Sequence, residues 1–401
     1  MAAVPRPVYA VWELTLGCDL SCNHCSSRAG RARPEELSTA EALALVEQLA
    51  DLGVQEVTLI GGEAYLRADW LDIIRAIRAR GLRCTLVTGG RGLDPARVAQ
   101  AKQAGLQGVS VSIDGLEASH DALRGVRGSF ASAFAALAAV KASGMQATAN
   151  TQVGRPNLKD IPALYDKLLE AGIAAWQAQV TVAMGRAADH PEVLLEPYQM
   201  IELMPMLARL QAKGDARGVV FWAGNNVGYF GPHEAQLRAA LPGQHRGSCG
   251  AGRAALGIES NGNIKGCPSL PSAEYVGGNV RDRPLRELWE RSPQVAFMRD
   301  RPASTLWGHC GTCYYAEECL GGCSWTAHSV MGRPGNNPYC HHRALMLLRQ
   351  GRRERVRRTS APPGGSFDLA TWELIEEPWP ENERARAEAV VRGEEVWLHP
   401  S

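Results

Sequence analysis

The fold is constrained most strongly by an alternation of short apolar runs with amphipathic segments, repeated six times between residues 8 and 213. The apolar runs predict strands over 8–14, 56–60, 83–88, 109–113, 146–153 and 175–181. The amphipathic segments predict a first helix opened by a capping box at Ser38 and Glu41, and later helices near 69–80, 94–104, 129–143, 159–171 and 197–213. We therefore predict an α/β fold with a partial (βα)6 TIM-type barrel, whose chemistry lies at the carboxyl ends of the strands.

A smaller region of different character follows the predicted barrel. Beyond about residue 245, short segments rich in Gly, Cys and Trp replace the alternating pattern, and such segments need metal ligation to hold a fold. We expect a barrel core over 8–220, a connecting segment over 221–244, a metal-stapled domain over 245–345, and an Arg-rich linker with an acidic tail over 346–401. The six arginines between 349 and 358 are expected on a solvated helix face that pairs with this tail, with peptide binding as the alternative.

Charge and composition exclude several classes of protein. The chain has 43 basic and 42 acidic side chains, so it lacks the broad positive field that nucleic-acid binding requires. No stretch approaches the roughly 20 apolar residues of a membrane helix, and the first residues lack the pattern of a signal peptide. We expect a cytoplasmic protein that binds neither nucleic acid nor membrane. In that reducing compartment, 11 cysteines favour metal ligation over disulfides.

The first cysteine group lies directly after the first predicted strand. Cys18, Cys22 and Cys25 are spaced C-x3-C-x2-C, which gives three thiolates where a 4Fe-4S cluster has four corners. An iron without a protein ligand is a place for chemistry. The spacing resembles that of the radical S-adenosylmethionine (SAM) superfamily, in which SAM binds the open iron and is cleaved to a 5'-deoxyadenosyl radical. A zinc site completed by a histidine such as His24 is the alternative.

Further motifs extend the resemblance to the SAM site. Gly61, Gly62 and Glu63 close the second predicted strand, where the family's GGE motif binds the SAM amino group; the usual following proline is replaced by Ala64. The paired glycines would let the backbone approach a ligand. By the same resemblance Ser112 contacts the SAM ribose, Arg124 pairs with the SAM carboxylate and His24 lies beside the adenine. Asp114 is either a ligand contact or a local Asx cap.

The second cysteine group resembles the SPASM domain. Its seven members follow the SPASM spacing, with Gly262 ahead of the second: Cys249, Cys267, Cys310, Cys313, Cys319, Cys323 and Cys340. The resemblance assigns one auxiliary cluster to Cys310, Cys313, Cys319 and Cys340. It assigns the other, inner cluster to Cys249, Cys267 and Cys323. The implied cofactors are thus SAM and three 4Fe-4S clusters, one binding SAM and two auxiliary. A zinc ribbon at 310–323 is the alternative for these four cysteines.

The inner auxiliary set has three cysteines where a cube needs four ligands. Relatives with full ligation carry another cysteine just before the Cys249 position, whereas this chain offers only Gln244, His245 and Arg246. Either one of these side chains completes the cluster or one iron is open. Cys84, on the third predicted strand, is expected to be a small core residue.

The resemblance implies a maturase that removes hydrogen from a ribosomally made peptide, giving a cross-link, a thioether or an oxidised residue. The expected partners are the precursor peptide and an electron donor such as flavodoxin or ferredoxin. Because about seven residues precede the first strand, a leader peptide would bind the barrel, the SPASM module or a separate protein. The sulfatase-maturing branch is disfavoured, because Cys267 is followed by Pro268 where that branch has a catalytic aspartate. The alternatives are oxidation of a small molecule or a haem-type substrate and, third, a zinc-stapled binding protein without catalysis.

Overall fold

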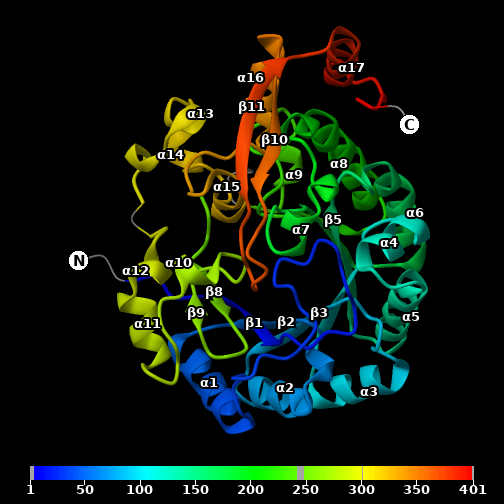
Figure 1. The fold of residues 1–401 in the computed structure, drawn as a ribbon. Helices are drawn as coiled ribbons and strands as arrows, with labels where there is room; N and C mark the ends of the chain where they lie inside the picture. Colours follow the sequence, from blue (N-terminus) through cyan, green and yellow to red (C-terminus); the bar gives the residue numbers. More distant parts are fainter. Residues whose placement is uncertain (1–3, 242–247, 300, 400–401) are drawn as a thin grey trace.

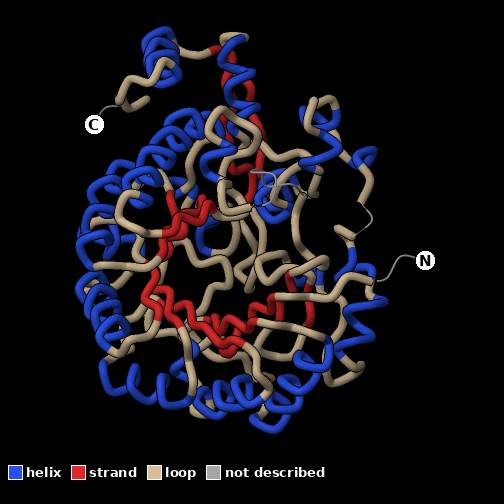
Figure 2. The backbone as a smooth tube through the Cα atoms, turned by 180° about the vertical axis from the view of Figure 1, so that it is seen from behind, coloured by secondary structure: helices blue, strands red, loops and turns tan. Residues whose placement is uncertain are grey.

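A curved sheet of nine strands organises the protein, in the order β7-β6-β5-β4-β3-β2-β1-β8-β9. The computed structural model describes residues 4–241, 248–299 and 301–399. The strands from β1 to β7 are parallel neighbours, and Figures 1 and 2 show the helices on the outer side of the curve. Their bounds are β1 Tyr9–Thr15, β2 Glu56–Gly61, β3 Arg83–Thr88, β4 Gly108–Ser112, β5 Gln146–Val153, β6 Ala175–Val180 and β7 Val220–Ala223. All six predicted strands are confirmed; β7 lies where a connecting segment was expected.

The outer helices follow the predicted pattern, with three short additions: α4, α7 and α9. Their bounds are α1 Thr39–Leu52, α2 Trp70–Ala79, α3 Pro95–Ala104, α4 Glu117–Arg124, α5 Ser129–Ala142, α6 Ile161–Ala171, α7 Arg186–Asp189, α8 Met200–Asp215 and α9 Glu234–Leu237. The capping box before α1 is confirmed, since the Ser38 hydroxyl accepts from the Glu41 amide and the Glu41 carboxylate accepts from the Ser38 amide. The short α4 was not predicted, yet its last residue is Arg124.

The second region joins the sheet of the barrel. Strand β8 (Ala255–Ile258) pairs in parallel with β1, and β9 (Ile264–Lys265) pairs antiparallel with β8. Short helices carry the rest of this region: α10 Ser272–Tyr275, α11 Leu285–Arg291, α12 Pro293–Ala296, α13 Gly308–Gly311, α14 Ala316–Cys319, α15 Ser324–Met331 and α16 His341–Arg349. The boundaries expected at residues 220, 244 and 345 remain predictions. Across the described ranges, no helix is long and apolar enough to cross a membrane.

The arginine-rich segment forms a strand, so the expected helix face is wrong. Strand β10 (Arg352–Ser360) pairs antiparallel with β11 (Thr371–Pro378), and the helix α17 (Glu381–Val391) follows. Its expected acidic partner is correct, because Arg352 lies 2.9 Å from Glu376 and Arg353 2.7 Å from Glu377 in cross-strand pairs. Opposite charges that face each other across two strands stabilise the hairpin. In a single helix the arginines would instead point into solvent. Figure 1 shows this hairpin running back to the mouth of the barrel.

A buried ion pair fastens this hairpin to the second region, and its removal is expected to be costly. Arg343 of α16 lies 2.5 Å from Glu354 of β10, and both side chains are buried. A Glu354→Gln substitution leaves the Arg343 charge buried without a counter-ion, so we expect a loss of about 3–5 kcal/mol in unfolding free energy. Anaerobic denaturation followed by circular dichroism measures it. The exposed Arg357–Glu373 pair of the same hairpin supplies the control, Glu373→Gln, which should cost under about 1 kcal/mol. Equal losses of unfolding free energy in the two variants would contradict the importance assigned to the buried Arg343–Glu354 pair.

Candidate active site

The loop after β1 gathers the first three cysteines. It is closed on itself because the Gly30 amide donates to the Leu16 carbonyl at 2.9 Å and the Cys18 amide to the Gly30 carbonyl at 3.1 Å. Burial raises the pKa of the Cys18 thiol to about 12, and Cys22 and Cys25 raise it further by their own negative charge. Burial likewise raises the pKa of Cys22 to about 11. A cation or a cluster bound by this loop would supply the positive charge that the Cys18 and Cys22 thiolates need.

The GGE turn at the end of β2 is packed directly against this loop. The Gly62 amide donates to the Thr15 carbonyl and the Glu63 amide to the Gly17 carbonyl, both at 2.7 Å. A Cβ at Gly61 would lie 2.2 Å from the Thr15 oxygen, and one at Gly62 would lie 2.1 Å from the Gly17 oxygen. The glycines are therefore required by the close approach of the cysteine loop, a reason that the sequence alone did not give. Their expected contact with SAM remains a prediction.

The carboxylate of Glu63, the predicted partner of the SAM amino group, is fixed by its neighbours. Its carboxylate is buried, accepts from the Gly89 amide at 2.7 Å and accepts from the Thr88 hydroxyl. Burial raises the pKa of Glu63 to about 7, against the lowering effect of these two hydrogen bonds. A nearby cation would relieve that cost. Thr88 and Gly89 were missed in the sequence, although the TGG at the end of the third strand repeats the position of the GGE turn.

Asp114 connects the other predicted SAM contacts. Its fully buried carboxylate lies 2.5 Å from Arg124 and 3.1 Å from His24, and it accepts from the Gln152 amide of β5 at 2.9 Å. Burial opposes its charge, but Arg124 and His24 outweigh that effect and hold the pKa of Asp114 below its usual range. The Asp114 side chain contacts residues of three other segments and does not cap its own turn, so the alternative of a local Asx cap is wrong.

Two atoms of this group favour a bound ligand. Arg124 Nε and His24 Nδ1 are buried without a hydrogen-bond partner among the described residues. Buried polar atoms are rarely left in that state. A ligand with both acceptor and donor groups, such as the carboxylate and the adenine of SAM, would satisfy them. The residues present therefore fit SAM, and Ser112 lines the same cavity.

The cavity above these groups has a volume of about 360 Å³ and is lined by all three parts of the chain. The barrel contributes the cysteine loop, the GGE turn and a row of amide side chains from β5 and β6: Asn150, Gln152, Gln177 and Gln179. The second region contributes Pro268, Ser269 and Trp325, and the hairpin contributes Phe367. On each strand the two amides are two residues apart, and alternate residues of a strand share one face. This spacing was the sequence signal that could have predicted the row. Nothing local in the sequence indicated Phe367.

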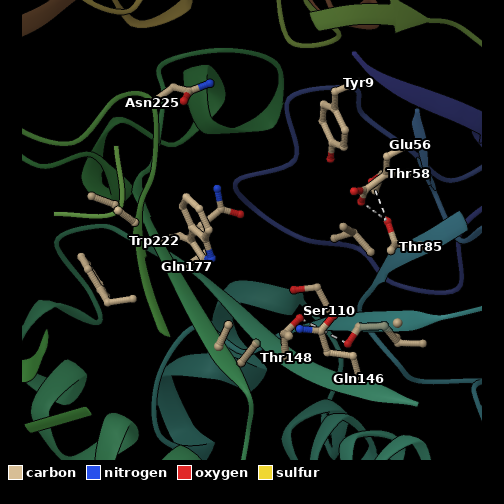
Figure 3. A pocket seen from close by; sticks show the side chains of 18 of the residues that line it. Tyr9, Glu56, Thr58, Thr85, Ser110, Gln146, Thr148, Gln177, Trp222 and Asn225 are labelled. Carbon is tan, nitrogen blue, oxygen red and sulfur yellow. Dashed lines mark hydrogen bonds between the residues drawn. The ribbon is translucent and has the colours of Figure 1, made fainter. Parts of the chain in front are cut away.

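A larger cavity of about 720 Å³ lies nearer the amino ends of the strands (Figure 3). Tyr9, Glu56 and Trp222 are among its lining residues. It shares Tyr9, Thr58, Val87 and Gln177 with the first cavity. The interior of the barrel is therefore hollow along much of its strands, and no described cysteine lines this lower part.

The remaining cysteines fall into the two expected groups. Burial raises the pKa of Cys267 to about 12, with further contributions from the charges of Cys249 and Cys323. The other four line one small pocket: Cys310, Cys313, Cys319 and Cys340. Gln244, His245 and Arg246 lie outside the described residues, so the fourth inner ligand stays a prediction. Cys84 is fully buried in the core, as predicted.

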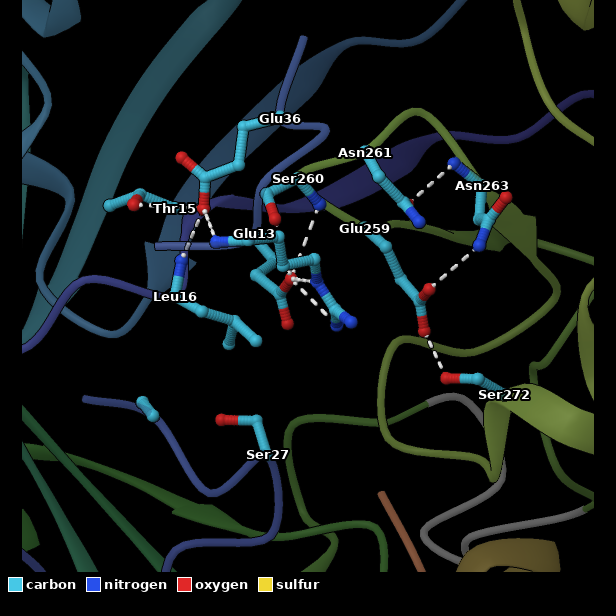
Figure 4. A network of polar contacts seen from close by, with 12 residues as sticks. Glu13, Thr15, Leu16, Ser27, Glu36, Glu259, Ser260, Asn261, Asn263 and Ser272 are labelled. Atoms are coloured by element: carbon cyan, nitrogen blue, oxygen red, sulfur yellow. Dashed lines mark hydrogen bonds and ion pairs between the residues drawn. The ribbon is translucent and has the colours of Figure 1, made fainter. Parts of the chain in front are cut away.

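Polar contacts at the β1–β8 junction join the two regions (Figure 4). Glu13 accepts from the Ser260 amide at 3.2 Å, from the Ser260 hydroxyl at 3.0 Å and from Arg33 at 3.1 Å. Glu259, the next residue back along the chain, accepts from Asn263 and Ser272 and pairs with Lys265 at 2.8 Å. The network fixes the inner cysteine region relative to the loop of the first three cysteines.

Comparison with known proteins agrees with this geometry. The chain matches the family models of the Radical SAM superfamily over residues 12–168 and of the SPASM iron-sulfur cluster-binding domain over residues 249–314. The AdoMet-dependent heme synthase of Methanosarcina barkeri is 31% identical over 350 residues, 86% of this chain and 99% of the relative. Mycofactocin maturase MftC of Mycobacterium ulcerans is 31% identical over 345 residues, 83% of this chain and 88% of the relative. This chain is therefore a radical SAM enzyme with a C-terminal SPASM domain.

A solved structure supports the fold class. Streptococcus suis SuiB bound to S-adenosylmethionine superposes with a TM-score of 0.65 at 18% identity, covering 84% of this chain and 76% of SuiB. The prediction of a partial barrel followed by a SPASM domain is thus confirmed. The family uses SAM and iron-sulfur clusters, whereas the number of clusters in this chain remains a prediction.

The cysteine grouping predicts the metal content. Protein reconstituted without air should carry about 12 irons and 12 sulfides, since ten cysteines lie in three sets. A variant with Cys18, Cys22 and Cys25 all changed to Ala should keep about eight irons, because the other sets lie in a different part of the chain. Iron and sulfide assays with Mössbauer spectroscopy measure this. About four irons with stoichiometric zinc in the wild type would contradict the auxiliary clusters.

The environment of Glu63 predicts its effect on SAM binding. Glu63→Gln removes the negative charge that an ammonium group would meet, so the affinity for SAM should fall about tenfold or more. Calorimetry on the anaerobic reconstituted protein measures the dissociation constant. Glu56→Gln is the matched control, because Glu56 begins the same strand and lines the lower cavity. Unchanged binding in Glu63→Gln would exclude the expected contact.

Proposed function

We propose that this enzyme oxidises a peptide in the cavity between the cysteine loop and the inner auxiliary set. The observation that carries this proposal is the lining of the cavity. Four neutral amide side chains stand along β5 and β6, and amides match the donors and acceptors of a peptide main chain. Among the described lining residues, Arg124 is the one basic side chain other than His24, and both are paired with Asp114. The lining thus favours an uncharged, amide-bearing substrate segment.

The proposal assigns a role to each group of residues around the cavity. SAM and the clusters, when bound, would supply the 5'-deoxyadenosyl radical that removes one hydrogen atom from a substrate carbon and the acceptor for the second electron, with loss of a proton. Cys18, Cys22 and Cys25 would hold the SAM-binding cluster, and Glu63 and Arg124 would orient the amino and carboxylate groups of SAM. Cys249, Cys267 and Cys323 would hold an electron acceptor beside the cavity, since Pro268 and Ser269 line it. Flavodoxin or ferredoxin is the proposed source of the first electron.

A second candidate is the oxidation of a haem-type tetrapyrrole. It is favoured by the sequence relatives, because the M. barkeri heme synthase is 31% identical over nearly its whole length. That name belongs to the relative, and MftC at the same identity is named as a maturase. The carboxylates of a tetrapyrrole would need cations that the described upper lining does not offer unpaired. The larger lower cavity leaves room for a tetrapyrrole to bind away from the upper lining.

Product analysis separates the two candidates. Reconstituted enzyme with SAM and dithionite is incubated with the peptide of a short reading frame beside its gene or with iron coproporphyrin III. The peptide proposal predicts that 5'-deoxyadenosine increases with the peptide and that the peptide loses two hydrogens by mass spectrometry. Turnover of the porphyrin with an inert peptide would support the second candidate instead. No 5'-deoxyadenosine under any condition would contradict both.

A further inference from the structure

The tip of the β10–β11 hairpin lies in the upper cavity, far in sequence from the residues around it. Phe367, in the turn between the two strands, is buried and lines the same cavity as Cys25, Trp325 and Pro268. Figure 1 shows the hairpin descending to the loop that follows β1. Its tip therefore closes one side of the space between the SAM-binding groups and the inner cysteine set.

An ion pair holds this tip on the cysteine loop. Arg28, three residues after Cys25, donates from Nε to Asp368 Oδ1 at 2.8 Å and from Nη2 to Asp368 Oδ2 at 3.3 Å. Arg28 also pairs with Asp189, so one guanidinium joins the cysteine loop, α7 and the hairpin. The Phe367 amide donates to the Ser26 carbonyl at 3.1 Å. A backbone hydrogen bond and a side-chain ion pair thus both hold the hairpin tip on the cysteine loop.

The backbone at both ends of this contact is strained. Phe367 has φ 57° and Arg28 has φ 51°, both in the left-handed region that side chains other than glycine rarely adopt. Such conformations persist where the surrounding contacts enforce them, and they gather at functional sites. Here they place the Phe367 ring over the buried ammonium of Lys265, whose Nζ lies 4.0 Å from the ring centroid. One side of the ring is therefore fixed to the second region.

We propose that Phe367 is a specificity-determining residue, held over the reaction cavity by the Asp368–Arg28 ion pair. The ring is the apolar counterpart of the amide row on β5 and β6, so it is suited to contact an apolar or aromatic group of a substrate whose polar groups meet the amides. This inference rests on the proposed function in taking the upper cavity as the place of reaction. It is independent of whether the substrate is a peptide or a tetrapyrrole.

The first test places a reporter at the tip and uses SAM alone as the probe. We expect 4-fluorophenylalanine at position 367 to show a 19F resonance that shifts on cluster reconstitution and again on addition of SAM. The same label at Phe134, on the outer helix α5, should respond to neither. A resonance at 367 that ignores both additions would overturn the placement of Phe367 in the cavity.

The second test measures what the ring excludes. Without substrate, an electron from dithionite cleaves SAM to methionine and the 5'-deoxyadenosyl radical, and added dithiothreitol can donate a hydrogen atom and become a thiyl radical. Phe367→Ala opens the wall to this thiol, so 5'-deoxyadenosine should form about tenfold faster at unchanged SAM affinity, with Phe367→Leu between the two. Asp368→Asn should shift the rate in the same direction.

Controls separate this inference from the proposed function and from misfolding. Glu373→Gln changes an exposed residue of the same hairpin and should keep the wild-type rate. Iron content equal to wild type shows that each variant is folded, and Phe367→Leu serves if Phe367→Ala loses iron. Wild-type rates in folded Phe367→Ala and Phe367→Leu would overturn the inference. A wild type that forms no 5'-deoxyadenosine would contradict the proposed function, while the 19F shifts would still decide the position of Phe367.

Discussion

Much of the structure depends on the central position of β1, which pairs in parallel with β2 on one side and with β8 on the other. The first pairing places the GGE turn against the loop of the first three cysteines. The second pairing makes the SPASM domain a continuation of the barrel's own sheet. Because a parallel sheet fixes the relative height of its strands, the two cysteine regions are held at a set separation by main-chain hydrogen bonds. A domain with little regular structure thereby gains a rigid base.

Charge compensation governs the site that this arrangement creates. Glu63 and Asp114 are both buried carboxylates near the cysteine loop, but their surroundings differ. Contacts with Arg124 and His24 stabilise Asp114 as an anion, whereas for Glu63 burial outweighs the hydrogen bonds from Thr88 and Gly89 and raises the pKa. Unequal environments give similar side chains different tasks. Asp114 positions Arg124 and His24, whereas the role proposed for Glu63 is to meet a cation from outside the protein.

The sequence was sufficient for the features that follow from local chemistry. Strand periods, the capping box and the cysteine spacings each depend on residues close together in the chain, and each was predicted correctly. The prediction failed where partners are distant. The arginine run has good helix-forming residues, yet its acidic partner strand lies more than ten residues further on and converts it to a strand. The contacts of Asp114 with β5 and of Gly61 with Thr15 likewise depend on tertiary packing, so only the residue types could be anticipated.

The position of the hairpin shows how such long-range pairing bears on chemistry. The paired strands β10 and β11 carry cross-strand ion pairs, and the buried Arg343–Glu354 pair fixes the base of the hairpin to α16. The tip of this supported hairpin holds the left-handed Phe367 against the cysteine loop, in which Arg28 is also left-handed. A radical formed in the cavity reacts with whatever hydrogen donor is near, so an enzyme of this kind must exclude small donors as well as bind its substrate. The proposed role of the Phe367 ring meets that requirement. The ring comes from a hairpin far along the sequence, so no residue of the cysteine loop has to serve as this barrier.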